Sequence, residues 1–548
     1  MRRFGLALLL VLTTWSRGAG ASDAPAASTP ATPAAPPPAT EAPPGATVLP
    51  TGLLSPDVEQ KISAGFLDTM ALVYQGRIVE ASARVKELLA LAPEDPRPYL
   101  LQARVLREYV SEQDNTRENV KPQIAPILGV LDTAKKKSEA ILEKDPESVA
   151  GHLYRGWANM FRGQLHELAF EHWSAGRAAK AGKSDLDQVL ARDPHNPDAL
   201  MITGTYLYFA DLLPGVLKLA SFLLRVPGGD REQGLEDLKL AEAVPSYSQY
   251  DARGMRGAIL FGFEGRLEDA RDLFDAFDRQ FPDNPRLVEP LAMIDLWFAN
   301  RIGSGLARVE RVVQANEHGP DPLSRELAAR LRLYQACMQI LSGRVEEGRE
   351  SLALLHRDNP GRPDWFRPVV DLYLCDTDLL LGEREKAAAV LKDAAKDSDL
   401  EKLLAYAQTD GAVASAEDVD TLRRLQPVAR AIYEGRLDEA ESSLRDFPPA
   451  SPFVVFYQAE ILQLRGRSRE ALPHYERLLA PAVPSRCRLF VRIARLRAAE
   501  IHASLGEWEA AAAAFEDEIE KYDVKDMLRH VVRARQRYFY READAVRG

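Results

Sequence analysis

The sequence predicts an all-α protein built as a solenoid of antiparallel helix pairs, and three observations lead to this prediction. From Leu53 onward the apolar residues recur with a period close to 3.6, and patterns typical of strands are nearly absent. Seven short motifs that begin with glycine recur along the chain. Each motif is surrounded by small and large residues at fixed distances. The seven motifs are GRIVEA at Gly76, GRLEDA at Gly265, GRVEEG at Gly343, GEREKA at Gly382, GRLDEA at Gly435, GRSREA at Gly466 and GEWEAA at Gly506.

The spacing around each marker glycine predicts how the two helices of a pair meet. The glycine is expected to end the first helix, because a left-handed cap carries no penalty without a Cβ atom. Small residues seven before and five after the glycine let the helices approach closely, and a large residue nine after it fills the gap behind them. In four motifs a proline seventeen residues after the glycine is expected to stop the second helix.

This pattern resembles the tetratricopeptide repeat (TPR), a helix pair with a period near 34 residues. Neighbouring marker glycines here lie 31 residues apart between Gly435 and Gly466, and 40 apart between Gly466 and Gly506, so the array is irregular. The resemblance implies a right-handed superhelix whose concave face, lined by the first helices, binds partners.

The first two segments predict export. Residues 1–21 have the features of a secretory signal: Arg2 and Arg3, an apolar run from Leu6 to Leu12, and the small residues Ala19-Gly20-Ala21. Residues 22–52 are rich in Pro, Ala and Thr, and we expect a disordered linker, either a tether or a passive tail. The arginine-rich composition suggests a bacterial source, so a periplasmic or secreted location is expected.

The helical body divides into three expected regions: an irregular TPR-like region over 53–245, central repeats over 246–410, and C-terminal repeats with a capping helix over 411–548. In the first region, His166 to Arg192 could form one extended helix. About 60 residues around Ala210 to Leu238 resemble the Iml2/TTC39 family of TPR proteins, which supports the helical fold. The matching residues are Leu212, Leu213, Pro214, Gly229, Asp230, Arg231, Gly234 and Leu235.

Composition and motifs argue against most chemistry. A net charge of −11 disfavours nucleic-acid binding, and the sequence predicts no cofactor and no enzyme. HELAFEH, at His166 to His172, misses the HExxH pattern of zinc proteases. Cys337 and Cys375 are expected to be buried thiols, with a disulfide between adjacent first helices left open; Cys487 is then left over.

Two sets of residues are candidates for partner binding. The first set occupies the positions ten, six and three before two marker glycines: Leu372, Asp376, Leu379, Phe456, Glu460 and Gln463. These mostly apolar or acidic residues disfavour the carboxylate clamp of chaperone-type repeats and favour an extended apolar segment or a helix as the ligand. The alternative is that this groove closes on itself as core.

The second set is basic. Arg488, Arg492 and Arg495 share one helical face and could bind an acidic partner or an anionic surface. The alternative is that they pair with the acidic helix from Glu507 to Glu520.

The sequence therefore predicts a non-catalytic exported scaffold that holds protein partners in the cell envelope, with no membrane span in the mature chain. The alternative is a periplasmic protein that encloses an apolar small molecule, with the pocket in the apolar stretch from Met201 to Ile259. The oligomeric state is not predicted.

Overall fold

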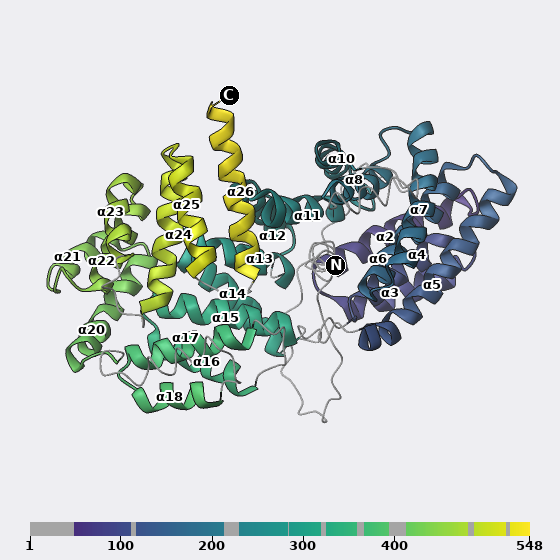
Figure 1. Ribbon diagram of the computed structural model, residues 1–548. Helices are drawn as coiled ribbons and strands as arrows, with labels where there is room; N and C mark the ends of the chain where they lie inside the picture. Colours follow the sequence, from purple (N-terminus) through teal and green to yellow (C-terminus); the bar gives the residue numbers. More distant parts are fainter. Residues whose placement is uncertain are drawn as a thin grey trace. The chain divides into compact units, whose positions relative to one another are not determined.

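The computed structural model describes residues 49–110, 117–212, 229–282, 284–318, 325–358, 366–393, 413–479, 487–521 and 527–547. Every regular element in these ranges is a helix, so the predicted all-α class is confirmed (Figure 1). None of the described helices is long and apolar enough to cross a membrane. The predicted signal segment 1–21 and most of the leader 22–52 lie outside the described residues.

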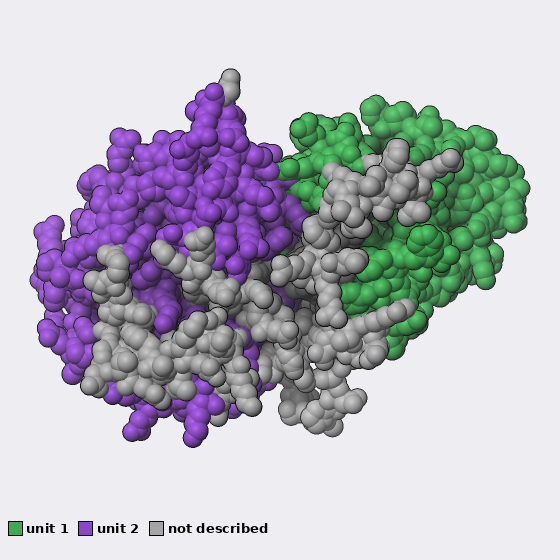
Figure 2. Space-filling model, in the orientation of Figure 1, with its two compact units in different colours: residues 1–259, 279–286, 319–324 green, residues 260–278, 287–318, 325–548 purple. Residues whose placement is uncertain are grey.

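The chain forms two compact units (Figure 2). Unit 1 comprises residues 1–259, 279–286 and 319–324, and unit 2 comprises residues 260–278, 287–318 and 325–548. The division near residue 260 differs from the expected boundary at 245/246. The expected boundary at 410/411 lies inside unit 2.

Unit 1 is a series of antiparallel helix pairs. Its helices are α2 (Pro56–Tyr74), α3 (Ile78–Leu91), α4 (Pro96–Arg107), α5 (Arg117–Lys144), α6 (Val149–Leu168), α7 (His172–Arg192), α8 (Pro197–Asp211), α10 (Arg231–Ala243) and α11 (Gln249–Ile259). Side chains cap several of these helices. Asp95 caps α4, Asn196 caps α8, and Asp230 caps α10 by accepting a hydrogen bond from the backbone N–H of Gln233.

Unit 2 continues the pairs. It contains η1 (Leu260–Glu264), most of α12 (Leu267–Gln280) and α13 (Pro285–Trp297), α14 (Ile302–His318), α15 (Arg325–Leu341), α16 (Val345–Asp358), α17 (Phe366–Leu380), α18 (Arg384–Asp393), α20 (Ala416–Tyr433), α21 (Leu437–Leu444), α22 (Pro452–Leu464), α23 (Ser468–Leu478), α24 (Arg488–Ser504), α25 (Trp508–Lys521) and α26 (Met527–Arg547). The final helix, α26, follows the last pair and packs against α25 and η1.

The turns inside the pairs adopt the predicted left-handed conformation. All seven marker glycines have φ between 69° and 83°. Two residues other than glycine also have positive φ, namely Phe170 at 57° and Asn300 at 49°. They lie in the turns of α6/α7 and α13/α14, two pairs that the glycine motif did not reveal. The expected single helix from His166 to Arg192 is therefore wrong: α6 ends at Leu168 and α7 begins at His172.

The small and large positions of the motif pack as predicted. The small residue five after the glycine is fully buried in six pairs: Ala81, Ala270, Ala387, Ala440, Ala471 and Ala511. In the seventh pair this residue is Gly348, where an added Cβ would lie 2.7 Å from the carbonyl oxygen of Ala336. The large residue nine after the glycine is buried in every pair: Val85, Phe274, Leu352, Leu391, Leu444, Tyr475 and Phe515.

The marker glycines provide a test of this packing. A Cβ at Gly435 would meet nothing within 4 Å, whereas a Cβ at Gly343 would clash with the backbone of Gln426. We expect Gly435→Ala to cost about 1–2 kcal/mol of unfolding free energy, from backbone strain alone. Gly343→Ala should cost a further ~1–3 kcal/mol, because α20 lies against this turn. Urea unfolding measures both; equal losses would contradict the close approach of α20.

Candidate functional site

The first helices of unit 2 contact one another across its interior. The guanidinium of Arg497 in α24 donates to the carbonyl oxygen of Leu296 in α13 at 3.0 Å. The hydroxyl of Tyr457 in α22 donates to the carbonyl oxygen of Leu341 in α15, also at 3.0 Å. Because these partners are far apart in the sequence, the contacts close the inner side of the unit.

Three of the predicted groove residues belong to this interior. Phe456 is fully buried, and its ring lies edge-on to that of Phe490 with 5.1 Å between centroids. Glu460 is also fully buried and accepts hydrogen bonds from the hydroxyls of Tyr433 (2.7 Å) and Tyr475 (2.5 Å). Gln463 is half-buried, and its side-chain oxygen accepts a hydrogen bond of 3.2 Å from the amide of Asn300. The carboxylate of Glu460 and the side-chain oxygen of Gln463 therefore already have partners.

The other three predicted groove residues lie on α17. Leu379 is fully buried and Leu372 is half-buried. Asp376 is buried and forms an ion pair with Arg488. Four of the six predicted groove residues are therefore buried and two are half-buried. Binding of a partner by them stays a prediction.

The predicted basic patch is also internal. Arg492 and Arg495 are 2% and 9% exposed, and both donate to the carboxylate of Glu518 in α25, at 2.6 and 2.7 Å. The guanidinium of Arg492 also lies 5.1 Å from the centre of the Trp297 ring. Together with the pair between Arg488 and Asp376, these contacts match the alternative of internal pairing, with Glu518 of the acidic helix as one partner.

All three cysteines, Cys337, Cys375 and Cys487, are buried and free, so the possible disulfide between Cys337 and Cys375 is absent here. Burial raises the pKa of the Cys337 thiol to about 12, which keeps this group protonated and unreactive near neutral pH.

The sequence analysis missed a polar cluster in unit 1 that holds the chain's own N-terminal segment. The hydroxyl of Tyr154 in α6 donates to the carbonyl oxygen of Leu49, and the hydroxyl of Thr51 donates to the carboxylate of Asp95 at 2.7 Å. Asp95 pairs with Arg97, and both are fully buried. Residues 49–51 therefore lie against the first helices α4 and α6.

Aromatic rings lie beside this cluster. The ring of Tyr247 is 3.9 Å from that of Phe66 and 6.2 Å from that of Trp157, measured between centroids. Trp157 is half-buried, so part of its ring is accessible. We use the name inner wall of unit 1 for the surface formed by the first helices α2, α4 and α6 together with Phe66, Asp95, Arg97, Tyr154, Trp157 and Tyr247. It combines hydrogen-bonding groups for a backbone with an apolar surface.

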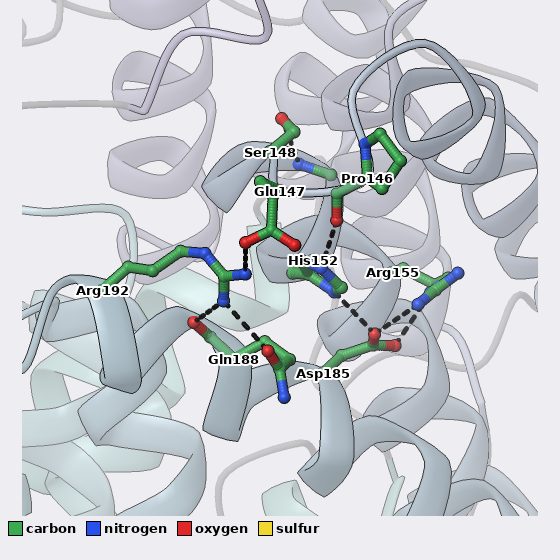
Figure 3. Close-up of polar contacts among 9 residues, drawn as sticks. Pro146, Glu147, Ser148, His152, Arg155, Asp185, Gln188 and Arg192 are labelled. Atoms are coloured by element: carbon green, nitrogen blue, oxygen red, sulfur yellow. Dashed lines mark hydrogen bonds and ion pairs between the residues drawn. The ribbon is translucent and has the colours of Figure 1, made fainter.

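A histidine and an aspartate of unit 1 resemble part of a catalytic site, but their geometry is structural (Figure 3). The Nδ1 atom of His152 lies 3.0 Å from Asp185, which also binds Arg155, and the Nε2 atom lies 3.0 Å from the carbonyl oxygen of Pro146. Both ring nitrogens are occupied, which leaves none for a substrate proton. These bonds tie α6 to α7. Among the described residues no cluster of His, Cys, Asp and Glu could hold a metal ion.

Residues 458–524 match the family model described as tetratricopeptide repeat. No curated protein matches the chain. Three similar solved structures are the human IFIT1 dimer with m7Gppp-AAAA (16% identity, 76% of this chain and 89% of that chain, TM-score 0.29), the TPR domain of P58(IPK) (15%, 77% and 97%, 0.19), and yeast Tom70 (16%, 89% and 97%, 0.17). TM-scores this low carry no argument about function.

The buried pairing of Glu518 predicts a large effect of removing its charge. Glu518→Gln leaves the charges of Arg492 and Arg495 uncompensated inside unit 2, and should lower the unfolding free energy by about 3 kcal/mol or more. Glu509→Gln is the matched control in the same helix, because among the described residues Glu509 pairs only with the exposed Arg547, so its loss should change stability by less than about 0.5 kcal/mol. Urea unfolding compares them; similar small effects would show that Glu518 is not the internal counter-charge.

Asp376 predicts a pH dependence. Burial raises the pKa of this carboxyl from 3.8 to about 7, although Arg488 opposes the shift. Because the folded state holds the proton more tightly, the contribution of Asp376 to stability is present below pH ~4 and is lost as the pH rises through about 7. Asp376→Asn should remove this part of the slope in unfolding curves measured between pH 4 and 8. Parallel slopes for the chain and the variant would contradict the assignment.

Proposed function

We propose that this tetratricopeptide-repeat protein is a non-catalytic scaffold of the cell envelope, and that unit 1 holds extended segments of partner proteins. The observation that supports this proposal is the position of residues 49–51 on the inner wall of unit 1. There Tyr154 binds a backbone carbonyl and Asp95 binds a side-chain hydroxyl, which are two contacts that a partner's extended segment can also make.

The inner wall suits a peptide better than a small molecule. Backbone recognition by Tyr154 is independent of sequence, and the accessible part of Trp157 offers apolar area for a side chain. Unit 2 offers less surface to a partner's segment, because its first helices already contact one another across its interior, α24 with α13 and α22 with α15. We therefore propose unit 1 as the binding unit.

The place of action rests on the sequence alone. The features of residues 1–21 support export, and a scaffold exported in this way would assemble proteins of the cell envelope.

No observation favours the alternative of an apolar-ligand carrier. The stretch proposed for its pocket, Met201 to Ile259, includes residues 213–228, which lie outside the described residues. A cavity of about 370 Å³ does lie between α25 and α26 in unit 2. Its lining is mostly polar or charged, which does not suit an apolar ligand: Glu516, Ile519, Arg533, Gln536 and Arg537.

Site-specific photocrosslinking in the native cells tests this function. A benzophenone amino acid at Trp157 replaces one aromatic ring by another on the inner wall, and the same amino acid at the exposed Tyr109 of unit 1 is the control. We expect a reproducible protein adduct, identified by mass spectrometry, that is about tenfold stronger at position 157, because binding energy concentrates at central aromatic residues. Equal adducts at both positions, or none at 157, would overturn the proposal.

A further inference from the structure

The turn between α6 and α7 of unit 1 carries backbone strain that the described turns with a marker glycine avoid. Seven helix pairs place glycine at the left-handed position and one places asparagine, but here Phe170 has a φ of 57°. A left-handed residue with a bulky side chain costs roughly 1–2 kcal/mol relative to an ordinary conformation. Strain of this kind persists where the side chain it displays has a use.

Two reciprocal hydrogen bonds hold this turn in one conformation. The ring of His166 binds the carboxylate of Glu171 at 2.8 Å, and the ring of His172 binds that of Glu167 at 2.8 Å. The Nζ atom of Lys121 in α5 lies 3.2 Å from the carboxylate of Glu171. The hydrogen bond with His166, and to a smaller extent the contact with Lys121, lower the pKa of the Glu171 carboxyl. The turn is therefore pinned to α5, α6 and α7 and is not a frayed helix end.

The pinned turn displays two aromatic side chains to solvent. Phe170 is 37% exposed and Trp173 is 65% exposed, whereas their neighbours Leu168, Ala169 and Ala175 are buried. A tryptophan ring has a large apolar body and one polar N–H, the combination that favours the boundary between water and lipid. The packing of the core of unit 1 does not require either ring to be exposed.

Basic residues follow on the same face of α7. Arg177 and Lys180 lie four and seven residues after Trp173, so the three side chains share one exposed helical face. Among the described residues no carboxylate pairs with either cation. The strip formed by Arg177 and Lys180 is positively charged, although the chain has a net charge of −11. It is therefore complementary to an anionic surface.

We propose that Phe170, Trp173, Arg177 and Lys180 form a membrane-contact site, in which the two rings enter the interfacial layer of an anionic lipid surface and the two cations bind its phosphate headgroups. The proposed contact is peripheral, because only these four side chains reach the lipid surface. Two aromatic anchors and two cations together supply the two kinds of signal that a stable peripheral attachment requires.

Sedimentation of the purified chain with vesicles tests the site. Vesicles of phosphatidylcholine with one quarter phosphatidylglycerol should bind the chain, and vesicles of phosphatidylcholine alone should bind it much more weakly. Arg177→Gln with Lys180→Gln should lower affinity for the anionic vesicles about thirtyfold, since each of the two cations near the surface contributes about 1 kcal/mol.

Phe170→Gly separates binding from folding. Glycine relieves the strained φ, so this variant should unfold at a higher urea concentration while its affinity for anionic vesicles falls about tenfold. Leu240→Ser is the control, because Leu240 of α10 is 43% exposed in the same unit and should not affect vesicle binding. Equal binding to both kinds of vesicle, or anionic binding unchanged in the Phe170 and Arg177/Lys180 variants, would overturn the proposal. So would a benzophenone at position 173 that crosslinks to a protein while the chain binds no vesicles.

Discussion

The fold depends on one backbone constraint, the residue with positive φ that reverses the chain between the two helices of nine described pairs. Glycine satisfies this constraint without cost, and it also leaves room for a later helix to approach. At Gly343 the backbone of Gln426 in α20 takes that room, and at Gly265 the backbone of Ala534 in α26 does so. The residue that ends the first helix of a pair thus also permits contacts between pairs far apart in the chain, all within unit 2.

The sequence was sufficient to predict the helix pairs whose turns contain a marker glycine, because the residues that determine such a pair lie within about 25 positions of one another. It was insufficient for α6/α7 and α13/α14, where Phe170 and Asn300 replace the glycine. A weaker signal was present in both, since the small residues Ala175 and Gly305 lie five positions after these turns. A search for small residues at the right spacing, without requiring glycine, would have found these pairs.

The candidate sites show the same limit over longer distances. Pairing of Arg492 and Arg495 with Glu518 was foreseeable, because α24 and α25 belong to one helix pair. The bond from Arg497 to Leu296 spans 201 residues, and that from Tyr154 to Leu49 spans 105. Contacts between residues so far apart in the sequence depend on small rotations between successive helix pairs, which add up along the chain. A local sequence pattern does not reveal this total rotation. For this reason the sequence left open whether the predicted groove residues of unit 2 are buried, and it did not reveal the inner wall of unit 1.

Repeat proteins usually change length over evolution by gaining or losing a repeat, because each unit contacts only its neighbours. Unit 2 does not have that freedom. The guanidinium of Arg497 reaches the carbonyl oxygen of Leu296, and that of Arg535 reaches the carbonyl oxygen of Gly265, only when the number of intervening helices is the present one. A duplicated helix pair between α15 and α22 would carry both arginines away from these carbonyl oxygens; Arg535 would keep its pairing with Glu500, whereas Arg497 would lose its bond to Leu296. These two bonds therefore tie the structure of unit 2 to its present number of helix pairs.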